Sequence, residues 1–285
     1  MPSGWNLSAA QWDMLTETLR LEGYPAPLQV RAHGRTDAAR GRIRAEVGEE
    51  LRQLGLLRAG RVDADLEAAL RLLHWPVSWL DSVWLPDAAV PQPVRVLAAR
   101  GGTLGVCALQ HPDRPGATVL DLVPAAGLAA AVVARLPPHP PGRSPGGTIA
   151  LAPSPELPSP GRSSSDRSSS DRPSPEWPSP DRPSSDRPAG VLVSASPART
   201  SAERERAAVC AILDQPHARA GQLAANRRDV AGRVHRSPVL RWCDNPDGRY
   251  QITITSRRGD RELTVTPGDP HRLATTLHHL LDTLH

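Results

Sequence analysis

Four histidines near the C-terminus are the residues whose type and spacing most directly suggest chemistry. His271, His278, His279 and His285 lie close together in the sequence, and imidazole nitrogens are common ligands of zinc. On a helix only His271 and His278 would share a face, and no carboxylate or thiolate completes a ligand set there. We therefore expect neither a metal site nor a bound cofactor.

Catalytic motifs are missing from the sequence. It contains no G-x-S-x-G nucleophile elbow, no P-loop, no G-x-G-x-x-G after a strand and no H-E-x-x-H zinc motif. Serine is concentrated between residues 153 and 188, in a stretch that is also rich in proline, aspartate and arginine. Such a stretch cannot hold the fixed geometry that a catalytic nucleophile needs. The sequence therefore favours a binding protein over an enzyme.

A basic run raises the question of nucleic-acid binding. Arg227, Arg228, Arg233, His235 and Arg236 could neutralise phosphates. However, all 34 basic residues of the chain are arginine, as codon usage in a GC-rich genome would produce, and the formal net charge is only +4. A solvated loop or an edge strand explains the run more simply. We expect no nucleic-acid partner, and we keep a nucleic-acid-binding regulator as the alternative function.

The cysteines and the N-terminus indicate a cytoplasmic protein. Cys107, Cys210 and Cys243 show no C-x-x-C spacing, and two of them lie in apolar strand patterns, which is typical of reduced thiols. The N-terminus lacks the basic flank and apolar run of a signal peptide, and no stretch approaches ~18 uninterrupted apolar residues. We expect no membrane insertion.

Residues 238 to 284 predict a complete supersecondary unit. Alternating residues from 239 to 243 and from 250 to 255 flank the turn sequence Asn-Pro-Asp-Gly, which is typical of a hairpin. A third strand over residues 262–266 leads to an Asp-Pro pair, the expected N-cap and first residue of a helix. Leucines at spacings of three and four then predict an amphipathic helix.

The same order of elements is predicted once before, between residues 93 and 136. Three strands, over 93–99, 103–109 and 118–123, precede a helix over 128–136. Two β-β-β-α units about 140 residues apart indicate an internal duplication. The predicted fold class is therefore α+β, with quasi-twofold duplicated units, a mostly antiparallel sheet and helical bundles.

Further helices are predicted in the N-terminal region. A capping box at Ser8 begins the first, and apolar stripes over residues 43–54 and 62–73 predict two more. Residues 25–30 between them are expected to form an edge strand. Three tryptophans follow within ten residues: Trp75, Trp79 and Trp84. They predict a strand or irregular segment that packs against the sheet. They would also suit an aromatic platform that binds a partner or a base.

Composition divides the chain into three parts. Residues 1–152 form a first half, residues 153–189 a Ser/Pro/Asp/Arg-rich insert, and residues 190–285 a second half. The insert repeats Ser-Ser-Asp-Arg and has almost no aliphatic residues. It cannot bury enough surface to offset its ordering entropy, so we expect it to be disordered. After it, Thr200 and Glu203 predict a second capping box.

Several short motifs resemble the EspG family of actinobacteria. Their order and spacing agree over nearly the whole chain apart from the insert: residues 7–15, residues 25–30, Gly221-Gln222-Leu223 with Arg227-Arg228-Asp229, Asp247-Gly248-Arg249-Tyr250, and residues 263–267. Two features depart from the family's pattern. Leu223 stands where an aromatic residue is expected, and the insert is unusual.

The resemblance implies a cytoplasmic chaperone associated with the ESX, or type VII, secretion system. It also implies a quasi-twofold α+β fold made of a β-sheet and two helical bundles. Mycobacterial members of the family bind PE–PPE heterodimers at the hydrophobic tip of the PPE protein. The implied partner here is therefore a secreted PE/PPE-like client, or another exported protein.

We place the predicted partner-binding surface on the sheet of the second half. Arg241, Trp242, Arg249 and Tyr250 combine large apolar side chains with positive charge, a mixture that interfaces favour. The alternative is that Trp242, Tyr250 and nearby Ile252 belong to the core. If the four residues bind a client, charge substitution of Arg249 or Tyr250 should weaken binding without unfolding the protein.

Overall fold

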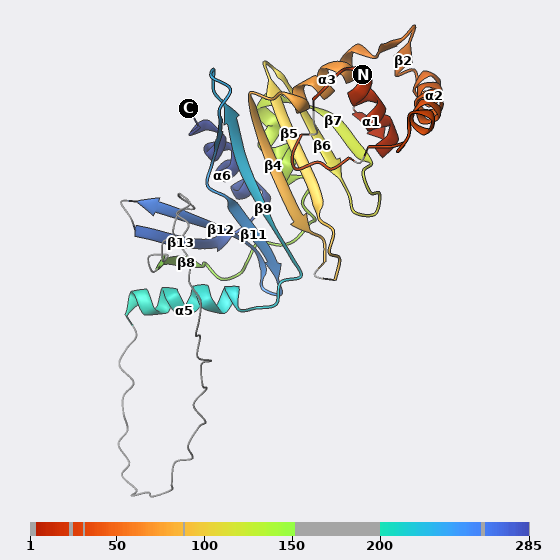
Figure 1. Ribbon diagram of the computed structural model, residues 1–285. Coiled ribbons are helices and arrows are strands. Elements are labelled where there is room, and N and C mark those ends of the chain that lie inside the picture. The colour runs from red at the N-terminus through yellow and green to blue at the C-terminus, as the bar shows by residue number, and fades with distance from the viewer. Residues whose placement is uncertain are drawn as a thin grey trace, which may run out of the picture.

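A computed structural model describes residues 4–22, 25–30, 32–87, 89–151, 200–257 and 260–284 (Figure 1). The insert predicted over residues 153–189 lies outside these ranges, so its disorder stays a prediction. The described parts fold into one large antiparallel sheet with helices on both faces.

Eleven strands of the described chain form this sheet, and every strand pair within it is antiparallel. Ten of them follow each other in the order β1 (Gly4–Leu7), β7 (Thr118–Pro124), β6 (Leu104–Gln110), β5 (Val94–Gly101), β4 (Ser78–Leu85), β9 (Arg219–Arg228), β11 (Leu240–Asn245), β12 (Gly248–Arg257), β13 (Asp260–Pro267) and β8 (Gly147–Leu151). The remaining strand, β10 (Val234–Arg236), pairs with the outer end of β9. A separate small hairpin joins β2 (Leu57–Arg58) to β3 (Arg61–Val62).

The strand order shows the internal duplication. From the central β4–β9 pair outward, one side of the sheet consists of β4, β5, β6, β7 and β1, and the other consists of β9, β11, β12, β13 and β8, although β8 comes from the end of the first half of the chain. In each half the third strand of the predicted unit ends at a proline, Pro124 or Pro267, and a helix follows. The predicted α+β fold class with duplicated β-β-β-α units is therefore confirmed. An outer strand and a helix also precede each β-β-β-α unit: β1 and α1 before the first, and β8 and α5 before the second.

Six α-helices in the described chain flank the sheet. They are α1 (Ala9–Thr18), α2 (Asp37–Gln53), α3 (Ala64–His74), α4 (Leu128–Val133), α5 (Ser201–Leu213) and α6 (Pro270–Asp282), with a short 3-10 turn, η1 (Ala125–Gly127), before α4. The capping boxes predicted at Ser8 and Thr200 are both present, and Asp269 caps α6 ahead of Pro270 as predicted. These caps satisfy backbone N–H groups that would otherwise lack partners at the helix starts.

The helices cover the two faces of the sheet differently. On one face α4 and α6 pack against each other over the central strands and bury Leu80, Leu223 and Trp242 with Leu273 and Leu277. On the other face α1, α2 and α3 cover the first-half strands, and α5 covers the outer strands of the second half. The middle of this second face, formed by β4, β9 and part of β11, is left without a helix (Figure 1).

Two parts of the fold differ from the sequence prediction. The basic run from Arg227 to Arg236 was expected as a loop or edge strand; Arg227 and Arg228 instead end the central strand β9, whereas Val234–Arg236 form β10, which pairs with the outer end of β9. Residues 25–30, expected as an edge strand, form no strand, because the Gln110 side chain replaces the partner strand. Its Oε1 accepts the Gln29 N–H at 2.8 Å, and its Nε2 donates to the Gln29 carbonyl at 3.1 Å.

Crossing a bilayer takes about 20 predominantly apolar residues in one helix. Within the described ranges no helix is long and apolar enough to do so.

Candidate functional site

The uncovered middle of the second sheet face forms a groove, which we call the central groove. Its floor consists of β4 and β9, and its hollow measures about 480 Å³. One wall is made by the C-terminal end of α3 and by Pro25–Pro27 between α1 and α2, and the other by β10. The lining residues are Pro25, Ala26, Pro27, Leu73, His74, Pro76, Trp79, Asp81, Val83, Leu97, Gln222, Asn226, Arg228, Val234 and Arg236.

A row of cross-strand neighbours crosses the middle of this face. Val83 of β4 pairs with Gln222 of β9, Gln222 pairs with Arg241 of β11, and Arg241 pairs with Ile252 of β12. Val83 and Ile252 are half-buried, whereas Gln222 and Arg241 are exposed. The row therefore offers a partner aliphatic surface beside polar and positively charged groups, drawn from both halves of the chain.

A polar cluster lies in the floor of the central groove and joins three strands. The buried Asp81 carboxylate accepts two hydrogen bonds from the Arg236 guanidinium, at 2.7 and 2.9 Å, and one from Asn226 Nδ2 at 2.7 Å. The Arg236 guanidinium also donates to Asn226 Oδ1 at 3.1 Å. A bidentate carboxylate–guanidinium pair fixes both partners in one geometry. The cluster thus holds β10 against β4 and keeps that wall in place.

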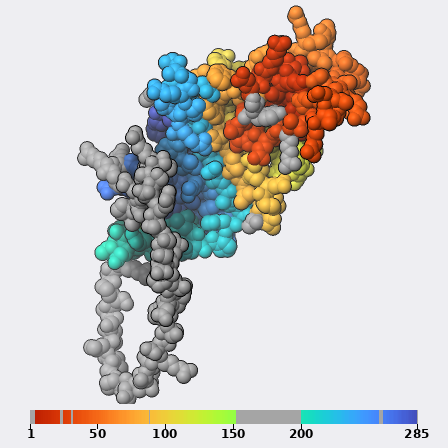
Figure 2. All heavy atoms as spheres, in the orientation of Figure 1, coloured from red at the N-terminus to blue at the C-terminus, as the bar shows by residue number. Residues whose placement is uncertain are grey.

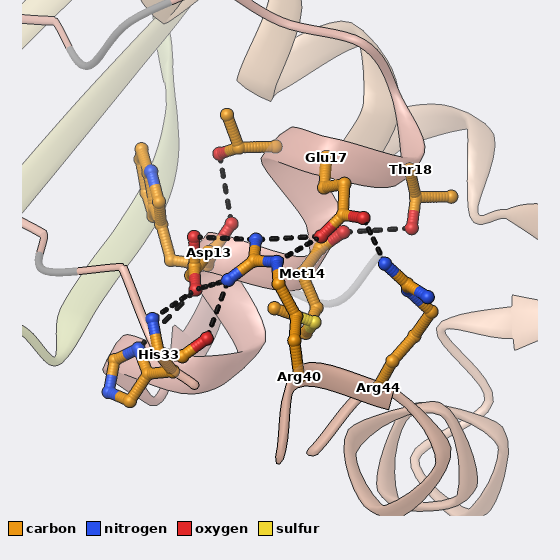
Figure 3. A network of polar contacts seen from close by, with 9 residues as sticks. Asp13, Met14, Glu17, Thr18, His33, Arg40 and Arg44 are labelled. Atoms are coloured by element: carbon orange, nitrogen blue, oxygen red, sulfur yellow. Dashed lines mark hydrogen bonds and ion pairs between the residues drawn. The ribbon is translucent and has the colours of Figure 1, made fainter. Parts of the chain in front are cut away.

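The wall on the side of the N-terminal helices rests on a second polar network (Figure 3). Asp13 of α1 is buried and accepts the His33 N–H at 2.7 Å and the Arg40 guanidinium at 3.0 Å. Arg40 of α2 also donates to Glu17 of α1 at 2.9 Å and to the His33 carbonyl at 2.6 Å. These bonds join α1, α2 and the segment between them into one unit, which includes the chain on either side of Pro25–Pro27.

His74 completes this wall at the C-terminus of α3. Its ring stacks on Trp12 of α1, with centroids 6.3 Å apart, and faces the central groove. Burial lowers the pKa of His74 below its usual range, so the ring is neutral at neutral pH. A neutral imidazole adds to the apolar character of the wall.

Three of the four residues predicted to bind a partner lie inside the protein. Trp242, Arg249 and Tyr250 are at most 2% exposed, so a partner cannot contact their side chains while the fold is intact. Trp242 and Arg249 face α4 and α6, whereas Tyr250 lies under α5. For these three residues the core alternative agrees with the structure. Arg241 is exposed and lies in the row described above.

The structure gives Tyr250 a role in holding the segment after α4. Its hydroxyl donates to the Asp247 carboxylate and accepts the Ser144 N–H at 3.0 Å. Gly142 lies directly on the ring, where an added Cβ would come within 2.1 Å of it. Tyr250 therefore joins the sheet of the second half to the last segment of the first half.

The ionisation of Tyr250 provides a first prediction. Burial, together with its hydrogen bond to Asp247, raises the pKa of Tyr250 to about 12. Because the folded pKa lies above the unfolded value of about 10, the phenol stabilises the fold below pH ~10, and this contribution is lost as the pH rises toward 12. The chain has two tyrosines. In a Tyr24→Phe variant, phenolate absorbance should titrate well above pH ~10. A midpoint at the ordinary value would contradict the buried position.

The histidines and cysteines that could have served chemistry do not form a site. Cys107 and Cys243 are buried and Cys210 is exposed, and all three are free thiols. His278 pairs with Asp282 one turn away, at 3.2 Å. Among the described residues, no group of three or more histidine, cysteine, aspartate or glutamate side chains is arranged to hold a metal ion.

Trp79 and Gln222 were noticed in the sequence, but Asp81, Ala224 and Asn226, which also lie in the floor of the central groove, were not. Trp79, Asp81 and Val83 alternate along β4 with residues that face α4 and α6, and Gln222, Ala224 and Asn226 do so along β9. The alternation is visible in both segments. It was not recognised as a strand in β9 because its side chains are small or polar.

Comparisons with known proteins agree with this architecture. The model of the EspG family matches residues 8–279. The structure is similar to that of the Mycobacterium tuberculosis type VII secretion system chaperone EspG5, which was solved in complex with a PE25–PPE41 dimer. The similarity covers 99% of this chain and 97% of that chain, with a TM-score of 0.62 and 16% sequence identity. No curated protein matches in sequence. Because the family model spans most of the chain, the protein belongs to the EspG family.

Proposed function

We propose that this protein is a chaperone of a type VII secretion system. It binds an exported client of the PE/PPE kind in the cytoplasm, covers an apolar surface on it and releases it at the secretion machinery. The similar protein EspG5 was solved in complex with a PE25–PPE41 dimer, which supports this class of client. Such a function needs a binding surface and no catalytic group, so we also propose that the protein is not an enzyme.

The observation that carries the proposal is the central groove. An ordinary protein complex buries roughly 800 Å² on each partner, and the open sheet face between α3 and β10 would contribute part of that area. The groove and the row of cross-strand neighbours that continues from it mix aliphatic side chains such as Val83 with Gln222 and Arg241, the composition typical of interface cores and rims. We therefore assign the client to the central groove, with Arg241 as the predicted contact that the structure leaves exposed.

Two substitutions in the groove test this assignment. Arg241→Glu reverses the exposed charge, and Gln222→Trp fills the middle of the row with a side chain that a strand tolerates. Each should lower the amount of client recovered by at least about fivefold, which corresponds to the ~1 kcal/mol expected of a contributing interface residue. The measurement is co-purification with co-expressed PE/PPE proteins from the same type VII locus.

The control is Arg42→Glu, an exposed arginine on α2 outside the groove. It should leave client recovery unchanged, and all three variants should melt close to the wild type because exposed substitutions rarely change stability by more than about 0.5 kcal/mol. Equal recovery of the client by wild type and both groove variants would show that the client binds elsewhere.

A further inference from the structure

The hairpin formed by the outer end of β9 and by β10 extends beyond the other strands of the sheet. We call residues 227–236 the β9–β10 arm. Its turn lies between Asp229 and Arg233, whose backbone groups bond to each other at 2.9 Å. In Figures 1 and 2 the blue tip of the arm lies at the end of the central strands.

The arm and the adjoining start of β4 carry an unusual share of exposed apolar surface. Seven large apolar side chains are exposed in the described part of the chain, and four of them gather here: Trp75 (69%), Val77 (58%), Val234 (51%) and the fully exposed Val230. Isolated exposed apolar residues are ordinary, but a cluster indicates an interaction site. Packing in the hydrophobic core does not explain this cluster, because its side chains are exposed.

Arg228 connects Trp75, Val77 and Val234, and Val230 follows two residues later in the turn of the arm. Its guanidinium lies 4.2 Å from the centre of the Trp75 ring, its backbone N–H donates to the Val77 carbonyl at 2.8 Å, and it pairs across the strands with Val234. Arg228 and Val234 also line the central groove. The apolar surface of the arm is thus a direct continuation of the groove past the end of the sheet.

The arm is also strongly basic. Residues 227–236 contain four arginines and one aspartate, a formal excess of three positive charges on a chain whose net charge is only +4. The Asp229 carboxylate already pairs with the Arg233 guanidinium at 3.2 Å and with His235 Nε2 at 3.1 Å. Asp81 of β4 pairs with Arg236, which leaves a formal excess of two positive charges on the arm, and an acidic partner would complement them because opposite potentials meet at specific interfaces.

The positions of the arginines favour a protein over a nucleic acid. Arg236 is paired with Asp81, Arg227 donates to the Leu284 carbonyl at 2.9 Å, and Arg228 is stacked on tryptophan. These bonds leave Arg233, with 78% of its side chain exposed, as the most accessible guanidinium. Phosphate binding relies on many free cations, whereas aliphatic side chains such as Val230 contribute little to it. Aliphatic groups with a basic rim suit an acidic, partly apolar peptide.

We infer that the β9–β10 arm, with Trp75 and Val77, is a charge-selective contact for an acidic segment of the client that carries aliphatic side chains. The inference rests on the proposed function for the identity of the partner. In this arrangement the central groove covers the apolar surface of the client. The arm adds selection by charge, since a client with basic residues at this position would be repelled.

A peptide assay tests the arm without the client. The probes are a fluorescein-labelled peptide of alternating Glu and Leu residues, its Lys/Leu counterpart and a short DNA duplex, and the readout is fluorescence anisotropy. The wild type should bind the acidic peptide in preference to the other two. The double variant Val230→Asp/Arg233→Glu should bind it at least about tenfold more weakly, a change of about 1.4 kcal/mol, and should favour the basic peptide instead.

The matched control is Leu54→Asp/Arg42→Glu, which changes an exposed leucine and an exposed arginine at α2. It should bind the acidic peptide like the wild type. Both double variants alter exposed side chains, so circular dichroism should show intact folding. Equal peptide binding by the wild type and the arm variant, or binding of the DNA duplex in preference to the acidic peptide, would overturn the inference.

Client recovery separates the failure of the two proposals. If groove variants lose the client while the arm variant keeps both the client and the acidic peptide, the arm proposal is overturned and the proposed function stands. If the wild type recovers no client but binds the acidic peptide through Val230 and Arg233, the proposed function fails and the charge-selective surface stands.

Discussion

Replacing Arg249 with alanine should lower the free energy of unfolding by about 3 kcal/mol or more, because it leaves a buried carboxylate without its main partner. Asp244 is fully buried and Arg249 is 2% exposed. Arg249 donates to the two carboxylate oxygens at 2.6 and 2.8 Å, and to the Pro137 carbonyl at 2.7 Å. Arg219 remains 3.7 Å from Asp244, which places the expected loss near the lower end of the ~3–5 kcal/mol range.

The loss should appear as a lower midpoint in urea denaturation followed by tryptophan fluorescence. Arg241→Ala is the matched control, since Arg241 is an exposed arginine on the neighbouring strand and should change stability by no more than about 0.5 kcal/mol. The double variant Asp244→Leu/Arg249→Met should be more stable than Arg249→Ala, because it removes both charges together. If Arg249→Ala and Arg241→Ala unfold at the same urea concentration, the buried pair does not stabilise the fold.

This expectation also changes how client-binding experiments should be interpreted. Charge substitution of Arg249 or Tyr250 was expected from the sequence to weaken binding without unfolding the protein. Because both side chains are buried, such variants should lose the client through unfolding. Arg241 is the predicted residue at which a binding defect can be measured on a folded protein.

Alternation along the second-half strands predicted the hairpin and the third strand correctly, but it could not show which face is covered. Period-two patterns indicate that a strand has two different faces. Here both faces are buried near the Asn-Pro-Asp-Gly turn, Trp242 and Arg249 beneath α4 and α6 and Tyr250 beneath α5. That coverage depends on helices that lie elsewhere in the sequence, so no local pattern contains it.

The strand β9 was missed for a packing reason. Gly221, a residue that usually indicates a loop, lies in the centre of the sheet between Trp84 and Trp242. An added Cβ would come within 2.4 Å of the Trp84 Cβ and 2.8 Å of the Trp242 Nε1. Glycine is therefore needed so that the two indoles can meet, and alanines at 224 and 225 allow close packing after it. The residues that make this strand fit also hide it from pattern analysis.

The central groove could not be predicted because it joins distant parts of the chain. Its floor requires Val83 to lie beside Gln222, and its polar cluster requires Asp81 to meet Arg236. Each of these pairs links the first half to the second across the insert. The basic run and the tryptophans were noticed separately in the sequence, but only the pairing of β4 with β9 places them on one surface.

The same pairing leads to the prediction with the largest effect, that the second half cannot fold alone. Residues 190–285 expressed by themselves should be insoluble or should unfold without a cooperative transition. Without the first half, β9 would present an unpaired edge along the residues that now pair with Ser78 to Leu85, and exposed strand edges promote aggregation. The leucines of α6 would also lose their contacts with α4, because Leu273 and Leu277 belong to a core shared by both halves.

A split protein provides the control for this experiment. Co-expression of residues 1–151 with residues 190–285 should restore a soluble complex, because loop closure through the insert contributes only a logarithmic entropy term whereas the shared core contributes most of the stability. Size-exclusion chromatography and thermal melting followed by circular dichroism would measure both outcomes. A second half that is soluble and melts sharply on its own would show two independent domains. In that case the β4–β9 contact would be an interface between domains, and the central groove could change shape as the two move.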